Sequence, residues 1–161
     1  MILRYRLEAN DRRPAITIVK HYETLPPLEC CHGQLNQVFM NLLTNAIDAI
    51  DLTGYDPQDC DPSEQPPRIE IRTRAIDQSA IEISISDNGL GIPTELQPRL
   101  FDPFFTTKPI GQGTDLGLAI SHEIIVQQHQ GAIAIDSELG RGTTFRITLP
   151  RYPTGYPSYR V

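Results

Sequence analysis

The sequence predicts a single α/β domain with two long helices and about five strands. Its 161 residues are enough for one domain with a substantial core. Residues 33–50 and 118–128 place apolar side chains at helical spacing. Five shorter segments alternate apolar and polar residues or are rich in β-branched residues, as strands are: 15–19, 68–73, 80–86, 132–136 and 143–149.

Charge and composition exclude several classes of partner. The net charge of −6 argues against nucleic acid and against an anionic membrane surface. No apolar run reaches the roughly 18 residues of a membrane span, and no signal peptide opens the sequence. We therefore expect a cytoplasmic segment with no direct membrane contact. Cysteines and histidines lack metal-ligand spacing, which favours free thiols in a reducing compartment.

The first elements suggest that the chain is part of something longer. Residues 2–7 have an apolar pattern without a capped start, so we expect the end of a helix that begins upstream, in a domain truncated at its N-terminus. Residues 15–19 are β-branched and predict a strand. His21 lies in a faint phosphoacceptor pattern, but that motif requires a long helix. A strand and the pair Pro26-Pro27 flank it here, which argues against that role.

The helix over residues 33–50 carries two different stripes. The apolar stripe consists of Leu35, Val38, Phe39, Leu42, Leu43, Ala46, Ile47 and Ile50. On another face Asn41, Asn45 and Asp48 follow each other by four and three residues. Asparagine is a mediocre helix former, so a functional stripe is favoured over a merely solvated face. An amide oxygen can bind Mg²⁺ while its NH₂ group meets a phosphate.

The strand over residues 80–86 ends in a second candidate motif. After a surface loop over residues 51–67, strands 68–73 and 80–86 are expected to form a hairpin. Asp87, Gly89 and Gly91 then form the pattern D-x-G-x-G. An aspartate at a strand end can accept hydrogen bonds from a flat ring bearing an amine, and glycines allow close approach to the backbone. An Asn-Gly turn without function is the alternative.

Two further loops complete the pattern. Residues 101–108 hold three of the five phenylalanines, which indicates either a lid or a loop packed down by aromatic rings. Residues 111–117 are glycine-rich and lead into the helix over 118–128, an arrangement that presents free N–H groups to phosphate. Strands 132–136 and 143–149 form a second hairpin, and residues 151–161 are expected to be a flexible tail.

These five features resemble, in order and spacing, the ATP-binding catalytic domain of sensor histidine kinases in the GHKL superfamily. The resemblance covers residues 15–149. It implies the Bergerat fold, an α/β (α+β) two-layer sandwich whose mixed sheet of about five strands is covered on one face by helices. The domain would span residues 1–150. ATP would lie between the helix layer and the lid.

The resemblance also implies roles for individual residues. Asn45 would bind Mg²⁺, with Asn41 near the phosphates, and Asp87 would accept from the adenine amine. Lys108 is a candidate for neutralising charge on the γ-phosphoryl group, with a solvated loop lysine as the alternative. The remaining residues expected to bind ATP are Gly89, Gly91, Ile92, Phe101, Phe104, Phe105, Gly111, Gly113, Thr114, Leu116, Gly117, Leu118 and Thr143.

Two positions separate the possible functions. Relatives that hydrolyse ATP place a glutamate where Asn41 stands, and an amide does not activate water, so an ATPase is less favoured. The resemblance therefore implies a histidine kinase that uses ATP and Mg²⁺. It would phosphorylate a separate phosphoacceptor and dimerisation domain and act upstream of a response regulator.

Asp115 replaces a glycine of the family's phosphate-binding loop. The alternative is therefore a degenerate module that binds ATP weakly and acts through partner contacts.

Overall fold

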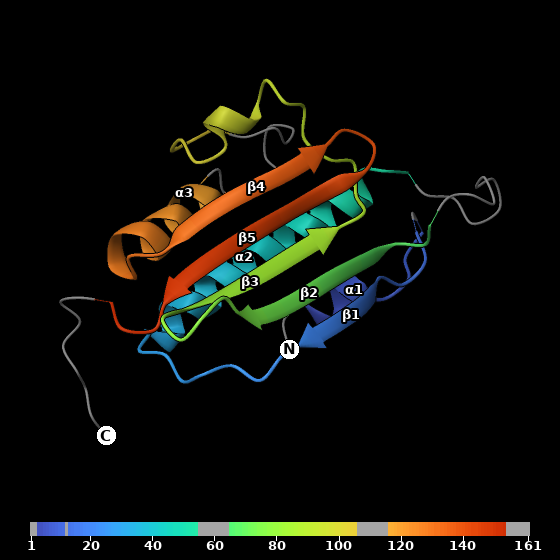
Figure 1. Ribbon diagram of the computed structural model, residues 1–161. Helices are drawn as coiled ribbons and strands as arrows, with labels where there is room; N and C mark the ends of the chain where they lie inside the picture. The colour runs from blue at the N-terminus through green and yellow to red at the C-terminus, as the bar shows by residue number, and fades with distance from the viewer. Residues whose placement is uncertain (1–2, 12, 55–64, 106–115, 154–161) are drawn as a thin grey trace.

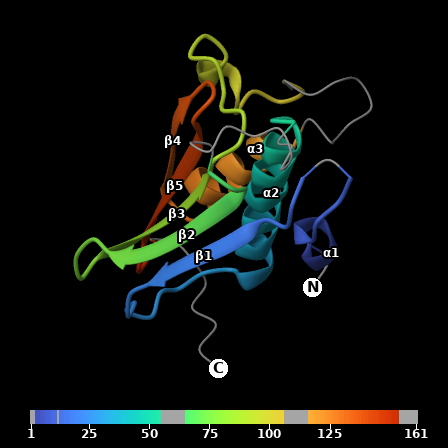
Figure 2. The same cartoon turned by 90° about the vertical axis from the view of Figure 1, so that its right-hand side faces the viewer.

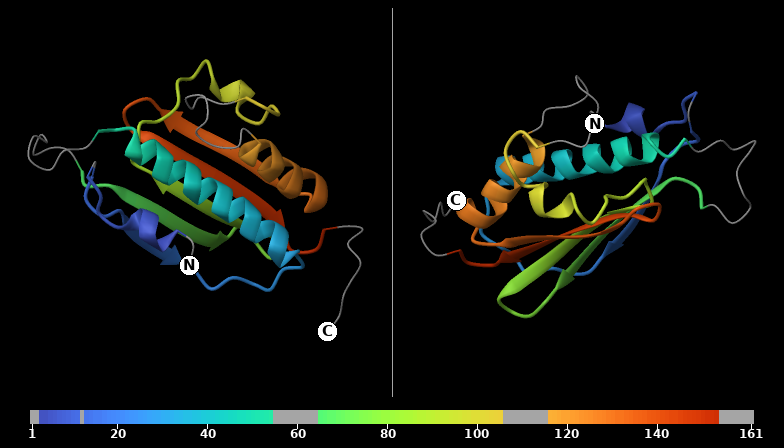
Figure 3. Two further views of the ribbon diagram at one scale, coloured as in Figure 1. Left: turned by 180° about the vertical axis from the view of Figure 1, so that it is seen from behind. Right: turned by 90° about the horizontal axis from the view of Figure 1, so that it is seen from above.

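The computed structural model describes residues 3–11, 13–54, 65–105 and 116–153, and it shows two layers (Figures 1 and 2). One layer is a twisted five-stranded sheet, and the other consists of helices packed on one of its faces (Figure 3). This arrangement confirms the two-layer α/β sandwich expected from the sequence. The elements in chain order are α1 (Arg4–Leu7), β1 (Thr17–Tyr22), α2 (His32–Asp51), β2 (Arg68–Ala75), β3 (Ala80–Asp87), η1 (Gln97–Arg99), α3 (Gly117–His122), η2 (Glu123–Gln128), β4 (Ala132–Glu138) and β5 (Gly142–Pro150).

The sheet has the strand order β1-β2-β3-β5-β4. β1 runs parallel to β2, and the other three pairs are antiparallel, so the sheet is mixed as expected. Both predicted hairpins are present, with Ile71 opposite Ile85 in β2–β3 and Ile133 opposite Ile147 in β4–β5. β3 is the central strand of the sheet, and β5 lies between β3 and β4, so each of these two strands is hydrogen-bonded on both sides.

α2 crosses the sheet along its whole length, and α3 with η2 lies beside it (Figure 3). The period-2 alternation of the strands directs their apolar side chains toward these helices and their polar side chains to the open face. On that open face His21 lies 3.6 Å from Glu70, and Glu70 also pairs with Arg72. The core between the layers consists of Ile16, Leu35, Val38, Leu42, Ala46, Ile47, Ile50, Ile69, Ile81, Ile83, Ile85, Ile124, Ile125, Phe145, Ile147 and Leu149.

β1 differs from the predicted strand in its position. It begins at Thr17 rather than Ala15, because the Ile16 N–H donates to the Leu7 carbonyl at 2.8 Å and ties this residue to α1. It continues through Lys20, His21 and Tyr22, whose polar and exposed side chains carry no strand pattern. Pairing with β2 therefore sets the end of this edge strand.

The second helix starts where the sequence predicts but changes type along its length. α3 is α-helical, whereas η2 has the wider π-helical hydrogen bonding. The buried His129 follows, with Nδ1 lying 2.9 Å from the Ile124 carbonyl oxygen and Nε2 accepting from the Cys31 N–H at 3.1 Å. This ring joins the end of η2 to the beginning of α2, which helps to set the two helices against one another.

The end of the domain is tied down beyond β5. Arg151, the first residue of the predicted tail, donates to the backbone carbonyls of Pro27 and Gln78, and Pro153 is buried. Residues 154–161 lie outside the described residues, and so do residues 55–64 of the surface loop predicted over residues 51–67. Within the described part of the chain, no helix combines the length and the hydropathy needed to span a bilayer.

Candidate functional site

A cavity of about 330 Å³ lies between the C-terminal half of α2, the connection after β3 and the β4–β5 turn. In Figure 1 that connection rises from the end of β3 past the turn, where the Gly140 N–H donates to the Leu90 carbonyl. Eight residues predicted for the nucleotide site lie together in the wall of the cavity: Asn45, Asp87, Gly91, Ile92, Phe105, Gly117, Leu118 and Thr143.

Asp87 is the last residue of β3 and faces the cavity beside Thr143 of β5. Burial raises the pKa of the Asp87 carboxyl to about 6, against the opposing effect of hydrogen bonds from the Gly89 and Thr143 backbones. The Gly89 N–H donates to Oδ1 of Asp87 at 2.9 Å. The carboxyl group is therefore oriented by the backbone and poised to titrate just below neutral pH.

The predicted glycines shape this corner through close backbone approach. A Cβ on Gly89 would lie 2.6 Å from the backbone carbon of Ala49 in α2. Gly91 has φ +75°, and a Cβ there would overlap the Glu138 carbonyl oxygen. The Leu90 N–H between them donates to the Ala49 carbonyl at 3.0 Å. The D-x-G-x-G segment is therefore clamped between the end of α2 and the β4–β5 hairpin.

The substitution Gly91→Ala is expected to lower the free energy of unfolding by about 2 kcal/mol or more, because it combines a left-handed backbone with steric overlap. Chemical denaturation measures this loss. Gly33→Ala is the matched control, since Gly33 lies in the first turn of α2 and a Cβ there meets no atom within 4 Å. That variant should be as stable as the wild type or gain up to about 1 kcal/mol. Equal stability of both variants would contradict the close approach at Gly91.

The two asparagines of α2 have different surroundings. Asn45 lies in the cavity wall, whereas Asn41 is not part of it. The Asn41 amide donates to the Gly117 carbonyl at 3.0 Å and to Oγ of Ser121 at 3.3 Å. Asn41 therefore holds the beginning of α3 against α2, next to the cavity residues Gly117 and Leu118.

The three predicted phenylalanines are also separated. Phe105 lines the cavity, and the Arg99 guanidinium lies 4.6 Å from the centre of its ring. Phe101 packs on the helix layer, with its ring 5.2 Å from that of His122. Phe104 is 76% exposed and has φ 65°, so it points away from the core. Only Phe105 of the three contributes to the wall of the cavity.

Hydrogen bonds of Ser137 and Gln97 support the wall of the cavity opposite α2. Oγ of Ser137 accepts from the Ile92 N–H at 2.9 Å and lies 2.9 Å from Oγ1 of Thr143. The Gln97 side chain donates to the carbonyls of both Ile92 and Ser137. These bonds join the predicted residues Ile92 and Thr143 through two residues, Ser137 and Gln97, for which the sequence gives no signal.

The sequence-based prediction missed further cavity residues and includes some that the structure does not describe. The missed lining residues are Asp48, Ala49, Leu52, Leu90, Pro93, Leu96, Leu100, Leu139 and Phe145. Asp48 belongs to the polar stripe of α2, which was the available signal for it. Leu116 directly precedes α3, outside the cavity wall. Lys108, Gly111, Gly113, Thr114 and Asp115 lie outside the described residues.

Similar proteins identify the type of domain. The chain is 41% identical to Sporulation kinase E of Bacillus subtilis (strain 168) over 128 residues, which are 80% of this chain and 15% of that protein. It is 43% identical to the signal transduction histidine-protein kinase AtoS of Escherichia coli (strain K12) over 131 residues, 81% of this chain and 19% of AtoS. The chain thus spans less than a fifth of the length of either curated relative.

Solved structures of histidine kinases are also similar to this chain. The nucleotide-free catalytic domain of histidine kinase ThkA matches with a TM-score of 0.68 and 26% identity, covering 94% of this chain and 86% of that one. ThkA in complex with the response regulator TrrA matches with a TM-score of 0.63 and 27% identity, over 88% of this chain and 36% of that one. The family model for histidine kinase-, DNA gyrase B- and HSP90-like ATPases matches residues 32–153. The chain therefore belongs to this family, as a catalytic domain of the sensor histidine kinase type.

Proposed function

We propose that this domain binds Mg-ATP and transfers the γ-phosphoryl group to a histidine on a separate phosphoacceptor and dimerisation domain, in two-component signalling. The observation that carries the proposal is a single cavity that joins the partly buried carboxyl of Asp87 to the amide of Asn45. An adenine nucleotide needs a hydrogen-bond acceptor for the amine of its base, which a carboxylate supplies. At the other end it needs a polar group that faces a metal-bound phosphate, which an amide supplies.

Asp87 and the surrounding apolar side chains would select the base. Oδ1 is held by the Gly89 N–H, which orients the carboxylate, and the ionised form accepts from the adenine amine. The wall around it is largely apolar, with leucines at positions 90, 96 and 100, and excludes water from that hydrogen bond. The cavity of about 330 Å³ is at the small end of ligand sites, which suits a flat base.

The residues present fit a magnesium ion that arrives with the nucleotide. Mg²⁺ prefers oxygen ligands and usually takes several of them from water and substrate phosphates. Among the described residues no group of three or more His, Cys, Asp or Glu side chains could hold a metal by itself. Asn45 would supply one amide oxygen. When bound, the ion would neutralise phosphate charge and orient the γ-phosphoryl group.

Asn41 favours phosphotransfer over hydrolysis. Its side-chain nitrogen already donates to Gly117 and Ser121, and an amide is not basic enough to activate water. A neutral histidine needs no such base, because imidazole is already nucleophilic near neutral pH. The domain's part in the reaction is then to position the nucleotide and stabilise its charge.

The comparisons support the partners of this reaction. AtoS is named a signal transduction histidine-protein kinase, and ThkA has been solved with the response regulator TrrA. We propose that a phosphoacceptor domain and, downstream, a response regulator are likewise the partners of this chain, and that it works in the cytoplasm.

Two measurements test the proposal. Mg-ATP at a hundred times its Kd should stabilise the domain by about 2.7 kcal/mol in thermal unfolding. ATP labelled in the γ-phosphate should then label the purified phosphoacceptor domain of a sensor histidine kinase, with the acid-labile, alkali-stable linkage of phosphohistidine. Absence of any thermal shift would refute nucleotide binding. A shift without transfer would leave a nucleotide-binding module that acts through contacts, and an ATPase would release inorganic phosphate without the acceptor.

A further inference from the structure

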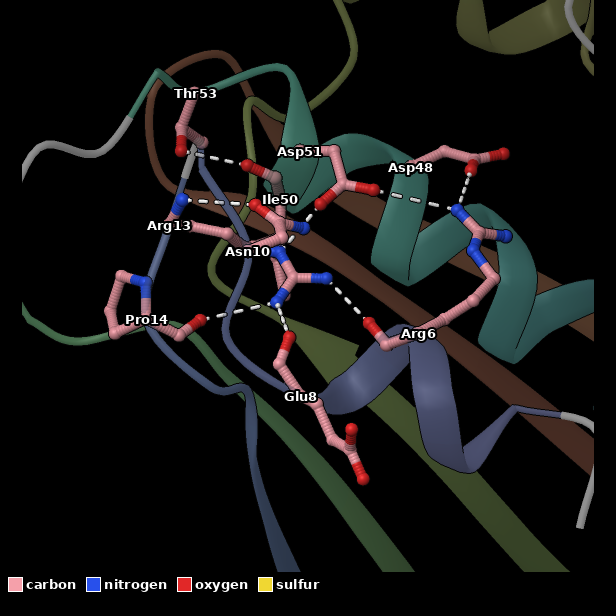
Figure 4. A network of polar contacts seen from close by, with 9 residues as sticks. All are labelled: Arg6, Glu8, Asn10, Arg13, Pro14, Asp48, Ile50, Asp51 and Thr53. Atoms are coloured by element: carbon pink, nitrogen blue, oxygen red, sulfur yellow. Dashed lines mark hydrogen bonds and ion pairs between the residues drawn. The ribbon is translucent and has the colours of Figure 1, made fainter.

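The segment before β1 is attached to the end of α2 by a network of charged groups (Figure 4). Nη2 of Arg6, on α1, lies 2.6 Å from Oδ1 of Asp48 and 3.4 Å from Oδ2 of Asp51. Arg13, whose side chain is 1% exposed, pairs with Asp51 and donates to three backbone carbonyls of its own segment. Arg13 thus holds the segment together, whereas Arg6 makes its charged contacts to α2 alone.

The C-terminal turns of α2 carry negative charge that only residues outside the helix can balance. Asp48 and Asp51 lie near the C-terminus of the helix, where the backbone carbonyls already carry partial negative charge. No basic residue lies in the last turn of α2. The two arginines of the preceding segment supply the charge that the helix itself lacks. Burial lowers the pKa of Arg6, but its hydrogen bond to Asp48 and both carboxylate charges outweigh this and raise the pKa.

Asp48 is also part of the nucleotide cavity. It lines the same wall as Asn45, three residues earlier on α2, while its side chain remains 26% exposed and paired with Arg6. Asp51 makes similar ion pairs but does not line the cavity. The negative charge of Asp48 adds to that of the helix terminus and repels an anionic nucleotide, and the guanidinium of Arg6 offsets this charge.

We propose that Arg6 is a positioning residue for nucleotide binding: its ion pair with Asp48 holds and neutralises a carboxylate in the cavity wall, so that docking of α1 on α2 and binding of the nucleotide favour each other. This inference rests on the proposed nucleotide site and adds a residue outside the cavity that controls it. By linkage, nucleotide must stabilise α1 docking by the factor by which docking tightens nucleotide binding.

A double-mutant cycle on Mg-ADP affinity, measured by calorimetry, tests the pair. Arg6→Gln should raise the Kd about threefold to tenfold, the size of one partly screened charge. Arg6→Lys, which keeps the charge, should stay within about twofold of the wild type. In an Asp48→Asn background, Arg6→Gln should change the Kd by less than about twofold, because no carboxylate remains to be neutralised. An equal weakening in both backgrounds would overturn the proposal, because a merely structural arginine gives that result.

Asp51→Asn is the matched control. It makes the same change one turn further along α2 and removes another partner of Arg6, but it lies outside the cavity wall. It should lower stability by leaving the buried Arg13 without its carboxylate, while the Kd for Mg-ADP stays within about twofold. A Kd that rises as much in Asp51→Asn as in Arg6→Gln would contradict a specific role for Asp48.

Hydrogen exchange supplies the reciprocal measurement. The N–H groups of Arg6 and Leu7 donate to the Leu3 carbonyl, and that of Ile16 donates to Leu7, so these three amides report whether α1 is docked. Mg-ADP should slow their exchange about threefold to tenfold in the wild type and leave it unchanged in Asp48→Asn. Unchanged exchange in a wild type that binds Mg-ADP would overturn the coupling alone, whereas a wild type that binds no Mg-ADP would overturn the proposed function as well.

Discussion

Asp87→Asn is expected to weaken Mg-ATP binding more than about a hundredfold, about 2.7 kcal/mol, without loss of stability in the ligand-free domain. The Gly89 N–H donates to Oδ1, so the atom at this position must remain an acceptor. The NH₂ group of an asparagine then takes the place of Oδ2, where it opposes the adenine amine, donor against donor. The charge-assisted hydrogen bond is lost, and a buried polar group is left unpaired.

The titration of Asp87 adds a pH dependence to this prediction. The pKa of about 6 lies above the ordinary 3.8, because burial disfavours the ionised form. The folded state therefore binds more protons than the unfolded state between these two values, and the stability of the ligand-free wild type should fall as the pH rises from about 4 to about 6, by at most about 3 kcal/mol. Nucleotide binding should show the opposite trend and weaken as the pH falls below about 6, because the protonated carboxyl is not an acceptor.

Calorimetric titration and thermal unfolding of both proteins, at several pH values, check these expectations. The asparagine variant should lack the stability change between pH 4 and 6 and should be at least as stable as the wild type at neutral pH. Asp136→Asn is the control, because that side chain is 72% exposed on β4, on the open face of the sheet. It should leave the Kd unchanged. Equal affinity of Asp87→Asn and the wild type would rule out this carboxylate as the partner of the base.

The elements that the sequence predicts best are those whose pattern and packing agree. In α2 all six buried residues belong to the predicted apolar stripe, because one helix face packs on one sheet along its whole length. The central strands β3 and β5 follow the same logic with a period of two. Asp87 could be placed at the end of a strand for this reason, and the glycines after it could be expected to allow close backbone contact.

The parts that escaped prediction depend on contacts between distant segments. Leu139 lies exposed in a hairpin turn and has no periodic pattern, yet it borders the cavity because the Gly140 N–H holds the turn against Leu90. Ser137 looks like any polar strand residue until Ile92 and Thr143 meet it. Lys20 and Tyr22 belong to a strand only because β2 offers its edge. A one-dimensional pattern does not contain these partners.

Asn41 and Asn45 show, within one helix, that the sequence pattern does not contain the contacts made by distant segments. Their spacing puts Asn41 and Asn45 on one stripe, and the family resemblance predicts Asn45 as a Mg²⁺ ligand and Asn41 near the phosphates. In the folded chain α3 packs against the first of them, so the side-chain NH₂ group of Asn41 donates to Gly117 and Ser121, while Asn45 borders the cavity. The packing of α3 therefore explains why Asn45, and not Asn41, borders the cavity, which the spacing of the two residues does not reveal.

Asn45→Ala is expected to reduce Mg-ATP-dependent phosphotransfer to a supplied phosphoacceptor domain at least about a hundredfold while the domain stays folded. Removing one preorganised electrostatic contact to a reacting phosphoryl group typically costs a factor of 10² to 10³. The substitution removes no part of the apolar seam of α2, and alanine favours the helix, so the free energy of unfolding should change by less than about 1 kcal/mol. Transfer of labelled phosphate and chemical denaturation of the same preparations measure the two effects.

Asn36→Ala is the control that isolates the cavity from the helix. Asn36 lies on α2, is exposed and does not line the cavity, so the same substitution there should keep both the activity and the stability of the wild type. A dependence on Mg²⁺ concentration separates a metal ligand from a phosphate contact. If Asn45 supplies an oxygen to the ion, the variant needs more Mg²⁺ for half-maximal activity at a fixed ATP concentration, whereas a lost phosphate contact raises the KM for Mg-ATP at saturating Mg²⁺. Full activity of Asn45→Ala would show that the polar stripe of α2 is only a solvated face and that Asn45 is not a metal ligand.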